Sequence, residues 1–364
     1  MPLASLIATG TKVWLDGVEP DNIAKNRALG VTGATSNPAI VSKIIGHGQL
    51  DGRIHELIEQ GLSDEEVAWE LDDELVTSAQ DVFRPVWDRT KGDDGYVSFE
   101  LDPLIEDEAT RLEHSQRVKQ YVDLAAKWSA GHKNRMIKVP ASPAGLDALE
   151  AIAAAGITIN VTLMFTQHQY QLARDAIWHG AQRRKMGLDD FKSVYSIFVS
   201  RIDVYTKQHV ADLSTGAQGL VGIVTAKRVW QENEQFWKNK GLRLRQEIVF
   251  ASTGVKTRDE PPDKYVESLA GSDIQTNPPA TNDFVEKSPK SYSRRIDHLP
   301  AAKIVNEIDE KVDMGALERV LMSEGIKKFA QPQKELIQLI SQKRATAGGI
   351  AHVARSRVSQ QAES

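Results

Sequence analysis

The sequence predicts an α/β fold, a (β/α)8 TIM barrel with extra helices, on two observations. Short runs rich in β-branched residues recur along the 364-residue chain, and longer segments with helical periodicity separate them. Strands that alternate with helices pair in parallel through right-handed crossovers, and eight such units fit a barrel. The alternative, an open doubly wound sheet, predicts a glycine-rich turn after the first strand, and Asp16-Gly17-Val18-Glu19 is not one.

The expected strands are short, apolar and bounded by turn residues. They are Lys12–Asp16, Val31–Thr35, Tyr96–Glu100, Arg135–Val139, Ile157–Thr162, Ser193–Phe198, Glu247–Ala251 and Ser272–Thr276. The helices between them are expected at Pro38–Ile45, Leu50–Gln60, Ser63–Trp87, Glu106–Ala130, Pro143–Ala155, Gln167–Met186, Ala217–Asn239 and Asp263–Leu269. The connections after the second and sixth strands are long enough to hold helical insertions.

The domain organisation expected from these elements is simple. Residues 1–344 form a single barrel domain with helical insertions, and residues 345–364 form a flexible C-terminal tail. The chain shows no internal repeat.

Composition narrows the class of protein. The net charge of −5 argues against a nucleic-acid partner, which usually meets a basic surface. The absence of cysteine excludes disulfides and thiolate nucleophiles, and it suits a reducing compartment. No signal peptide is evident, and no apolar stretch approaches the roughly 18 residues of a membrane-spanning helix. We therefore expect a cytoplasmic protein with no membrane association.

Polar residues gather at the ends of the expected strands. In a barrel enzyme the active site lies at the carboxyl ends of the strands, so these residues are the candidates for its chemistry. They are Asp16, Asn37, Glu100, Lys138, Asn160, Thr162, Ser196, Arg201, Ser252 and Lys256.

Lys138 is the sharpest of these candidates. It lies inside an apolar strand that Pro140 closes. Burial favours the neutral amine of a lysine, and that amine is a nucleophile toward carbonyl groups. The alternative is a lysine on an edge strand that reaches solvent. Asp16 and Glu100 could divide proton transfers beside the amine, although Asp16 could instead cap a turn and Glu100 could form a structural ion pair.

The other candidates have weaker signals. Asn37 precedes Pro38 and could simply cap the helix that Pro38 begins. Arg201 offers bidentate geometry to a phosphate, and the Ser252–Lys256 turn follows the seventh strand, where barrels often bind phosphate. The histidines show no metal-ligand spacing, so no metal site is expected.

Several motifs in register resemble those of the transaldolases. Gly33-Ala-Thr-Ser-Asn-Pro-Ala-Ile40 resembles the first signature of that family, and Arg135-Met-Ile-Lys-Val-Pro-Ala-Ser-Pro-Ala-Gly145 resembles the second, which carries a Schiff-base lysine. Ile159–Thr166 and Ser196–Arg201 are similar to the family's fifth- and sixth-strand segments. The resemblance runs from about Thr11 to about Ile340.

The resemblance implies a barrel of the class I aldolase type with Lys138 as the Schiff-base residue on the fourth strand. It implies that Asp16 deprotonates the C4 hydroxyl of the ketose. Glu100 would act through a water during carbinolamine dehydration, and Thr162 would support that water. No cofactor is implied, because the lysine itself supplies the electrophile.

The resemblance also implies a substrate-binding set. It consists of Asn37, Asn160 and Ser196 around the three-carbon unit, Phe198 on the pocket wall and Arg201 at the phosphate. The chain departs from the family where many transaldolases carry Ser-Phe-Arg after the seventh strand. In this segment the chain is similar to the transaldolase branch that has longer and isomerase-fused members. Ser252 and Lys256 are therefore the candidates for the second phosphate ligand.

The function implied is that of a transaldolase in the pentose phosphate pathway. It would transfer a dihydroxyacetone unit from sedoheptulose 7-phosphate or fructose 6-phosphate to glyceraldehyde 3-phosphate or erythrose 4-phosphate, as a monomer or homodimer. A lyase similar to fructose 6-phosphate aldolase is one alternative, but those enzymes are generally shorter and lack the residue seen here as Glu100. A non-catalytic barrel that binds sugar phosphates is the other, and it would have no need of Lys138.

Overall fold

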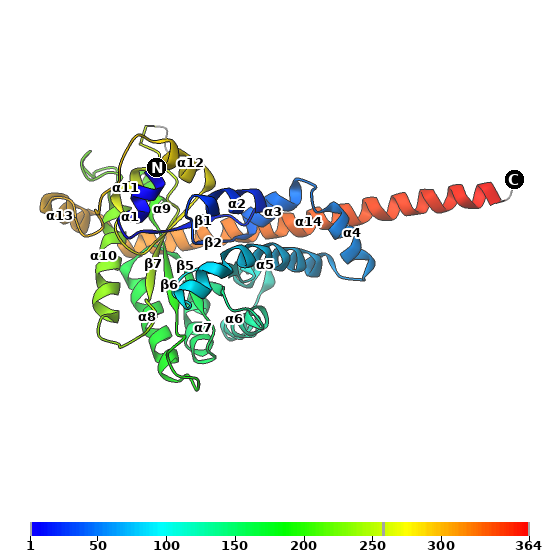
Figure 1. The fold of residues 1–364 in the computed structure, drawn as a ribbon, viewed down its shortest axis with the longest axis horizontal. Coiled ribbons are helices and arrows are strands. Elements are labelled where there is room, and N and C mark those ends of the chain that lie inside the picture. Colours follow the sequence, from blue (N-terminus) through cyan, green and yellow to red (C-terminus); the bar gives the residue numbers. More distant parts are fainter. Residues whose placement is uncertain (1, 257–258, 363–364) are drawn as a thin grey trace.

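A closed barrel of eight parallel strands, hydrogen-bonded in chain order from β1 to β8, forms the centre of the molecule (Figure 1). The computed structural model describes residues 2–256 and 259–362, and side chains as far as residue 346. The strands are β1 (Lys12–Asp16), β2 (Gly33–Thr35), β3 (Val97–Glu100), β4 (Arg135–Pro140), β5 (Ile159–Met164), β6 (Ser193–Phe198), β7 (Glu247–Ala251) and β8 (Ile274–Asn277). The predicted (β/α)8 barrel is confirmed.

Helices surround this barrel, as the alternating sequence pattern predicts. They are α1 (Pro2–Ala8), α2 (Pro20–Ala28), α3 (Pro38–Gly46), α4 (Asp51–Glu59), α5 (Asp64–Thr90), α6 (His114–Ser129), α7 (Pro143–Ala154), α8 (Gln167–Gln182), α9 (Val199–His209), α10 (Val221–Trp237), α11 (Lys264–Ser268), α12 (Pro279–Lys287), α13 (Ala302–Lys311) and α14 (Met314–Ala362). The expected insertions follow β2, as α3 to α5, and β6, as α9 and α10.

Local side-chain signals fix where several of these helices begin. Ser63 and Glu66 form a reciprocal capping box at the start of α5. The Ser142 hydroxyl accepts a hydrogen bond from the Gly145 N–H at the start of α7. Because such caps can be read from the sequence, the starts of these helices lie within one residue of the predicted positions.

One predicted helix, Glu106–Ala130, is wrong over its first turns. The chain instead makes two short 3₁₀ turns, η1 (Pro103–Glu106) and η2 (Glu108–Thr110), before α6. The Asp102 carboxylate accepts from the Leu104 N–H and the Asp107 carboxylate from the Ala109 N–H, so each aspartate caps its own short turn. These local bonds compete with a continuous helix.

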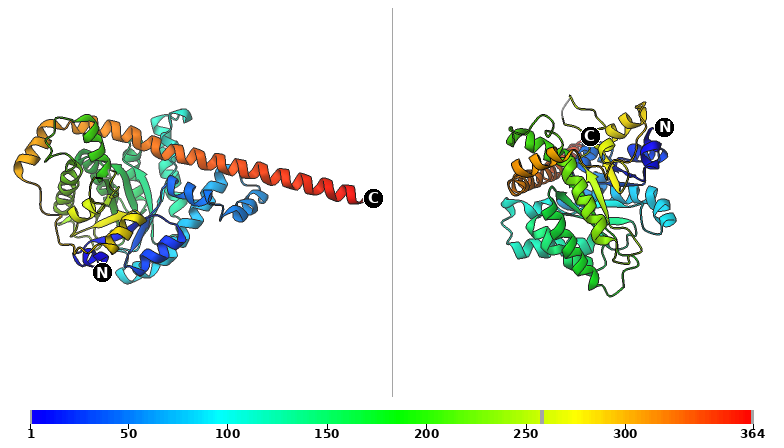
Figure 2. Two further views of the ribbon diagram at one scale, coloured as in Figure 1. Left: turned by 90° about the horizontal axis from the view of Figure 1, so that it is seen from above. Right: turned by 90° about the vertical axis from the view of Figure 1, so that its left-hand side faces the viewer.

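Helix α14 crosses the mouth of the barrel and contacts α3, α4, α5, α9, η1 and β5 (Figure 2). Its backbone continues as a helix to Ala362, and the expected flexibility of residues 345–364 stays a prediction. Within the described part of the chain, no helix is both long and apolar enough to cross a membrane.

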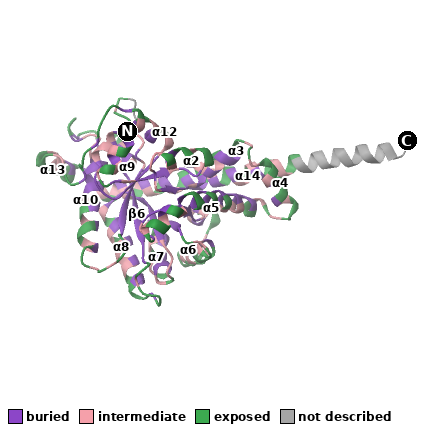
Figure 3. Ribbon diagram, in the orientation of Figure 1, coloured by how far each residue is buried: buried purple, intermediate pink, exposed green. Residues whose placement is uncertain are grey.

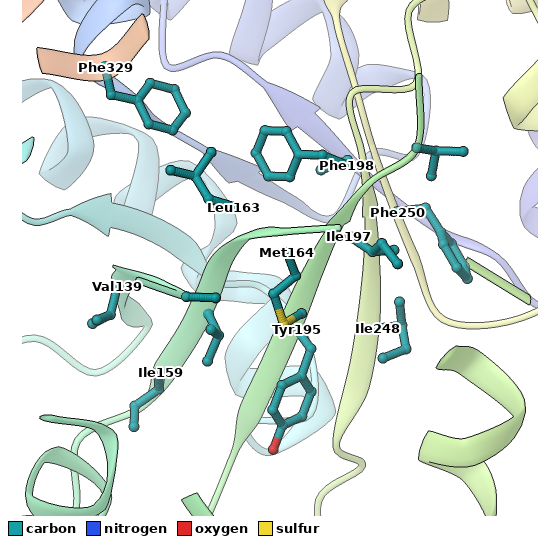
Figure 4. Packing of buried hydrophobic residues seen from close by; sticks show 14 of the residues in the cluster. Val139, Ile159, Leu163, Met164, Tyr195, Ile197, Phe198, Ile248, Phe250 and Phe329 are labelled. Carbon is teal, nitrogen blue, oxygen red and sulfur yellow. The ribbon is translucent and has the colours of Figure 1, made fainter. Parts of the chain in front are cut away.

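The strands are buried on both faces, as a closed parallel barrel requires (Figure 3). One set of alternate strand residues packs inside the barrel: Trp14, Tyr96, Met136, Val194, Val249 and Ile274. The other set, which includes Val139, Ile197 and Phe250, packs against the helices (Figure 4). Gly33 makes room for the interior set, since a Cβ there would lie 2.7 Å from the Trp14 indole.

A buried ionic cluster closes the amino end of the barrel. Glu247 accepts hydrogen bonds from Lys12 at 2.8 Å and from Lys192 at 2.6 Å, and Asp93 also pairs with both lysines. The side chains of Lys192 and Glu247 are fully buried. This cluster lies at the end of the strands opposite to the one where Lys138 lies.

Candidate active site

The register of three neighbouring strands sets Glu100, Lys138 and Asn160 side by side at one level of the barrel. Lys138 follows the interior residue Met136 by two positions, and side chains two apart in a strand share a face. The Lys138 side chain therefore enters the barrel interior toward its carboxyl end. The same period of two brings Asp16 after Trp14 and Ser196 after Val194 to this end.

Lys138 is buried with only 4% of its surface exposed, which rules out the solvent-reaching alternative. A closed barrel also has no edge strand. Its Nζ donates hydrogen bonds to Glu100 Oε2 at 2.8 Å and to the Ser36 carbonyl at 3.0 Å. Burial raises the pKa of the Glu100 carboxyl, and the nearby Lys138 charge opposes that effect. The pair can exchange a proton directly.

Asp16 lies at the carboxyl end of β1 and faces the same space. Its carboxylate accepts a hydrogen bond from the Thr35 hydroxyl at 3.2 Å, and that hydroxyl lies 2.9 Å from the Thr276 hydroxyl. Burial raises the pKa of Asp16, while the Lys138 charge pulls it back toward its ordinary value. A carboxylate with a raised pKa is a stronger base than an exposed aspartate.

A small cavity of about 140 Å³ unites most of the predicted site residues. Its lining includes nine of them: Asp16, Asn37, Lys138, Thr162, Ser196, Phe198, Arg201, Ser252 and Lys256. Glu100 and Asn160 do not line it. They lie just behind it, through their hydrogen bonds to Lys138 and Ser196.

Asn37 combines its two expected roles. Its Oδ1 accepts a hydrogen bond from the Ile40 N–H at 3.1 Å, so it caps α3 as the alternative interpretation predicts. The same residue lines the cavity. Because the cap uses the side-chain oxygen, the amide nitrogen remains to donate to a ligand.

A short chain of hydrogen bonds connects polar side chains from strands β3, β5 and β6 at the site. The Ser196 hydroxyl donates to Asn160 Oδ1 at 2.7 Å, and Asn160 Nδ2 donates to the Ser98 hydroxyl at 2.8 Å. The Thr162 hydroxyl is buried in the cavity wall and has no hydrogen-bond partner among the described residues. It is therefore available to a ligand.

Positive charge lies at one side of the cavity. Arg201, on the first turn of α9, has its guanidinium carbon 5.0 Å from the centre of the Phe198 ring and forms no salt bridge with a described side chain. Lys256 is a second cation on the wall. The residue is exposed, but partial desolvation of its amine and the Arg201 charge lower its pKa. Ser252 holds a left-handed backbone, with φ of 55°, and its hydroxyl lies 2.8 Å from that of Ser200. This arrangement suits an anionic group.

The remaining lining residues were not predicted from the sequence. They are Thr35, Ala251, Gly254, Thr276, Pro278 and Phe329. Thr276 ends the eighth predicted strand, so the rule that selected Asp16 could have selected it too. Phe329 carried no signal, because only the path of α14 brings it here. Among the described residues, no group of three or more histidine and acidic side chains could hold a metal ion.

Comparison with known proteins gives a consistent result. The sequence model of the transaldolase/fructose-6-phosphate aldolase family matches residues 13–340. A transaldolase of Thermobifida fusca (strain YX) is 31% identical over 94% of this chain and 98% of its own length. A transaldolase of Parafrankia sp. (strain EAN1pec) is 30% identical, with coverage of 95% and 99%. A transaldolase of Mycobacterium bovis (strain BCG / Pasteur 1173P2) is also 30% identical, with coverage of 92% and 95%.

These matches span the barrel, every predicted site residue and most of α14. Together with the lysine in the barrel interior, they show that the chain belongs to the transaldolase/fructose-6-phosphate aldolase family.

Proposed function

We propose that this enzyme is a transaldolase that transfers a dihydroxyacetone unit between sugar phosphates through a Schiff base on Lys138. The donor is sedoheptulose 7-phosphate or fructose 6-phosphate, and the acceptor is glyceraldehyde 3-phosphate or erythrose 4-phosphate. One observation carries the proposal: a buried lysine, paired with one carboxylate and facing a second, lines a small polar cavity. The proposal assigns the enzyme to the cytoplasm, as a monomer or homodimer.

Formation of the Schiff base begins with a proton transfer within the Lys138–Glu100 pair. Lys138 passes a proton to Glu100 along their 2.8 Å hydrogen bond and becomes a neutral amine. The amine attacks the C2 carbonyl of the ketose to give a carbinolamine. Glu100, acting through a water that Thr162 supports, then returns its proton to the departing hydroxyl, and the iminium forms with loss of water. Burial of Glu100 favours the protonated form that this step needs.

Carbon–carbon cleavage uses Asp16 as the base. Asp16 takes the proton of the C4 hydroxyl, the C3–C4 bond breaks, and its electron pair moves into the iminium to form an enamine. The aldose phosphate leaves, and the three-carbon unit stays on Lys138. The acceptor aldehyde then enters, the same steps run in reverse, and Asp16 returns its proton to the new hydroxyl.

The other cavity residues supply binding and orientation. Asn37 and Ser196 would hold the hydroxyls of the three-carbon unit, and Phe198 would form its apolar wall. Asn160, which lies behind the cavity, would contribute to this binding by orienting Ser196 through their 2.7 Å hydrogen bond. Arg201 would bind the phosphate, because its charge is not neutralised by a described carboxylate at salt-bridge distance. Ser252 and Lys256 are the candidates for the second phosphate ligand, since both line the cavity with Arg201.

The experiment follows glyceraldehyde 3-phosphate release from fructose 6-phosphate by coupled NADH oxidation, with and without erythrose 4-phosphate. We expect sustained release only when the acceptor is present. Sustained release without acceptor would instead indicate a fructose 6-phosphate aldolase-like lyase. A folded protein that releases none under either condition would contradict the proposal and favour a non-catalytic sugar-phosphate-binding barrel.

A further inference from the structure

An aromatic residue from the last helix forms part of the cavity wall beside the reactive lysine. Phe329 of α14 is only 6% exposed. The centre of its ring lies 5.7 Å from Lys138 Nζ and also 5.7 Å from the guanidinium carbon of Arg201. Figure 4 shows its ring above Leu163 and near Phe198. The ring thus spans the region between the amine and the proposed phosphate site.

The fit of α14 to the barrel explains how Phe329 reaches this position. Gly325 lies one helical turn before Phe329 and on the same face of α14. A Cβ on Gly325 would lie 3.0 Å from Leu163 Cδ2, so the glycine allows a close approach of the helix. Leu163 itself has a positive φ of 54°, where the register of β5 with β6 shifts. Both features hold Phe329 close to the cavity.

Polar contacts fasten α14 on both sides of Phe329. Glu318, earlier in the helix, accepts a hydrogen bond from the Thr166 hydroxyl at the start of α8. Arg344, later in the helix, donates to Asp64 at the start of α5 at 2.6 Å. These contacts oppose movement of the helix away from the barrel mouth.

The position of Phe329 matters because the enamine on Lys138 can react in two ways. After cleavage, the three-carbon enamine on Lys138 can attack an acceptor aldehyde. Alternatively its carbon can take a proton from solvent, which restores an iminium, and one water then hydrolyses that iminium to dihydroxyacetone and the free Lys138 amine. The two reactions diverge at the enamine carbon, because its protonation takes a proton from solvent, whereas its attack on an aldehyde does not. Both reactions end with hydrolysis of an iminium, which uses the water assigned to Glu100 and Thr162. An apolar ring beside the enamine keeps other water from delivering that proton.

We propose that Phe329 determines reaction specificity by shielding the Lys138 enamine from protonation by solvent. This inference rests on the proposed transaldolase function and deepens it. Attack on an aldehyde is unaffected by this shielding, whereas release of dihydroxyacetone needs a proton from solvent at the enamine carbon. The residue acts on the ratio of the two reactions more than on either alone.

The test measures both products from fructose 6-phosphate in the wild type and in Phe329→Leu and Phe329→Ala. Transfer is followed as acceptor-dependent glyceraldehyde 3-phosphate release, and hydrolysis as free dihydroxyacetone. We expect the ratio of hydrolysis to transfer to rise by about tenfold in Phe329→Leu, and further in Phe329→Ala. Gln331→Ala, an exposed change on the same helix, is the matched control and should leave the ratio unchanged.

Gly325→Ala offers an independent variant that keeps the Phe329 ring. Its added methyl group should displace α14 from Leu163 and raise the ratio of hydrolysis to transfer by a smaller factor than Phe329→Leu. A folded Phe329→Leu protein in which both reactions slow equally would overturn the inference and leave the proposed function intact. Absence of acceptor-dependent release in the wild type would instead contradict the proposed function itself.

Discussion

The Lys138–Glu100 pair contains the two groups through which protons must move during Schiff-base formation. Both residues could be predicted as site candidates from the sequence, because each is a charged residue near the carboxyl end of an expected apolar strand. Their partnership could not, because it depends on the register between β3 and β4. The same limit applies to Thr35 and Thr276, whose hydroxyls meet beside Asp16.

Replacement of Glu100 by glutamine tests the proton transfer at the residue scale. Glutamine keeps the size of the side chain and can still accept a hydrogen bond from Lys138, but it cannot take its proton. We expect the Glu100→Gln protein to fold and its transfer rate to fall by about 10²-fold or more. Circular dichroism and the coupled assay provide the measurements. A wild-type rate in a folded Glu100→Gln protein would exclude the assigned role.

At the scale of single elements, the sequence patterns predicted the boundaries of helices and strands best where a local signal fixes them. Strands β1, β6 and β7 match their predicted bounds, and the cap at Ser63 marks the start of α5. The course of β5 to Met164 was missed because its end depends on the irregular pairing at Leu163. Helix α14 was not among the expected helices, and periodicity alone does not show which face of the barrel a helix covers.

Asp72 on α5 gives a pH-dependent prediction for that element. Its side chain is buried, and its Oδ1 has no hydrogen-bond partner among the described residues. Burial raises its pKa from 3.8 to about 7, although the Arg135 charge opposes the shift. The folded protein therefore holds this proton more tightly than the unfolded chain. Ionisation of Asp72 thus lowers the free energy of unfolding progressively between pH 3.8 and about 7, and fully above that range.

Substitution of Asp72 by asparagine removes this ionisation with little change of shape. We expect Asp72→Asn to be more favourable for stability at pH 8 than at pH 5, by roughly 2–3 kcal/mol. Urea unfolding of both proteins at the two pH values gives the difference. An equal effect of the substitution at pH 5 and pH 8 would show that Asp72 does not titrate as proposed.

For the whole molecule, we expect one end of the barrel to serve catalysis and the other to serve stability. The carboxyl end holds the candidate site, and the buried cluster of Lys12, Lys192 and Glu247 closes the amino end. The barrel itself could be predicted from the alternation of strands and helices. The contact of Phe329 with the site could not, because it joins the last helix to strands that come much earlier in the chain.

The separation of the two ends predicts that stability and catalysis can be changed independently. Glu247→Gln would remove one carboxylate from the fully buried ammonium group of Lys192 and the partly buried one of Lys12, at a cost of about 3–5 kcal/mol in the free energy of unfolding. Its turnover per folded molecule should stay near that of the wild type. Asp123→Asn, which breaks only an exposed pair with Lys119, is the control and should cost less than about 1 kcal/mol. A Glu247→Gln protein of normal stability but low turnover would contradict this division.

Covalent trapping tests the central claim most directly. The enzyme is incubated with fructose 6-phosphate, reduced with borohydride and digested. Its peptides are then analysed by mass spectrometry. We predict a three-carbon adduct on the peptide that contains Lys138, none on the peptide that contains the equally buried Lys192, and none in Lys138→Ala. An adduct that persists in folded Lys138→Ala protein, or that forms at another lysine, would contradict the assignment of Lys138 as the Schiff-base residue.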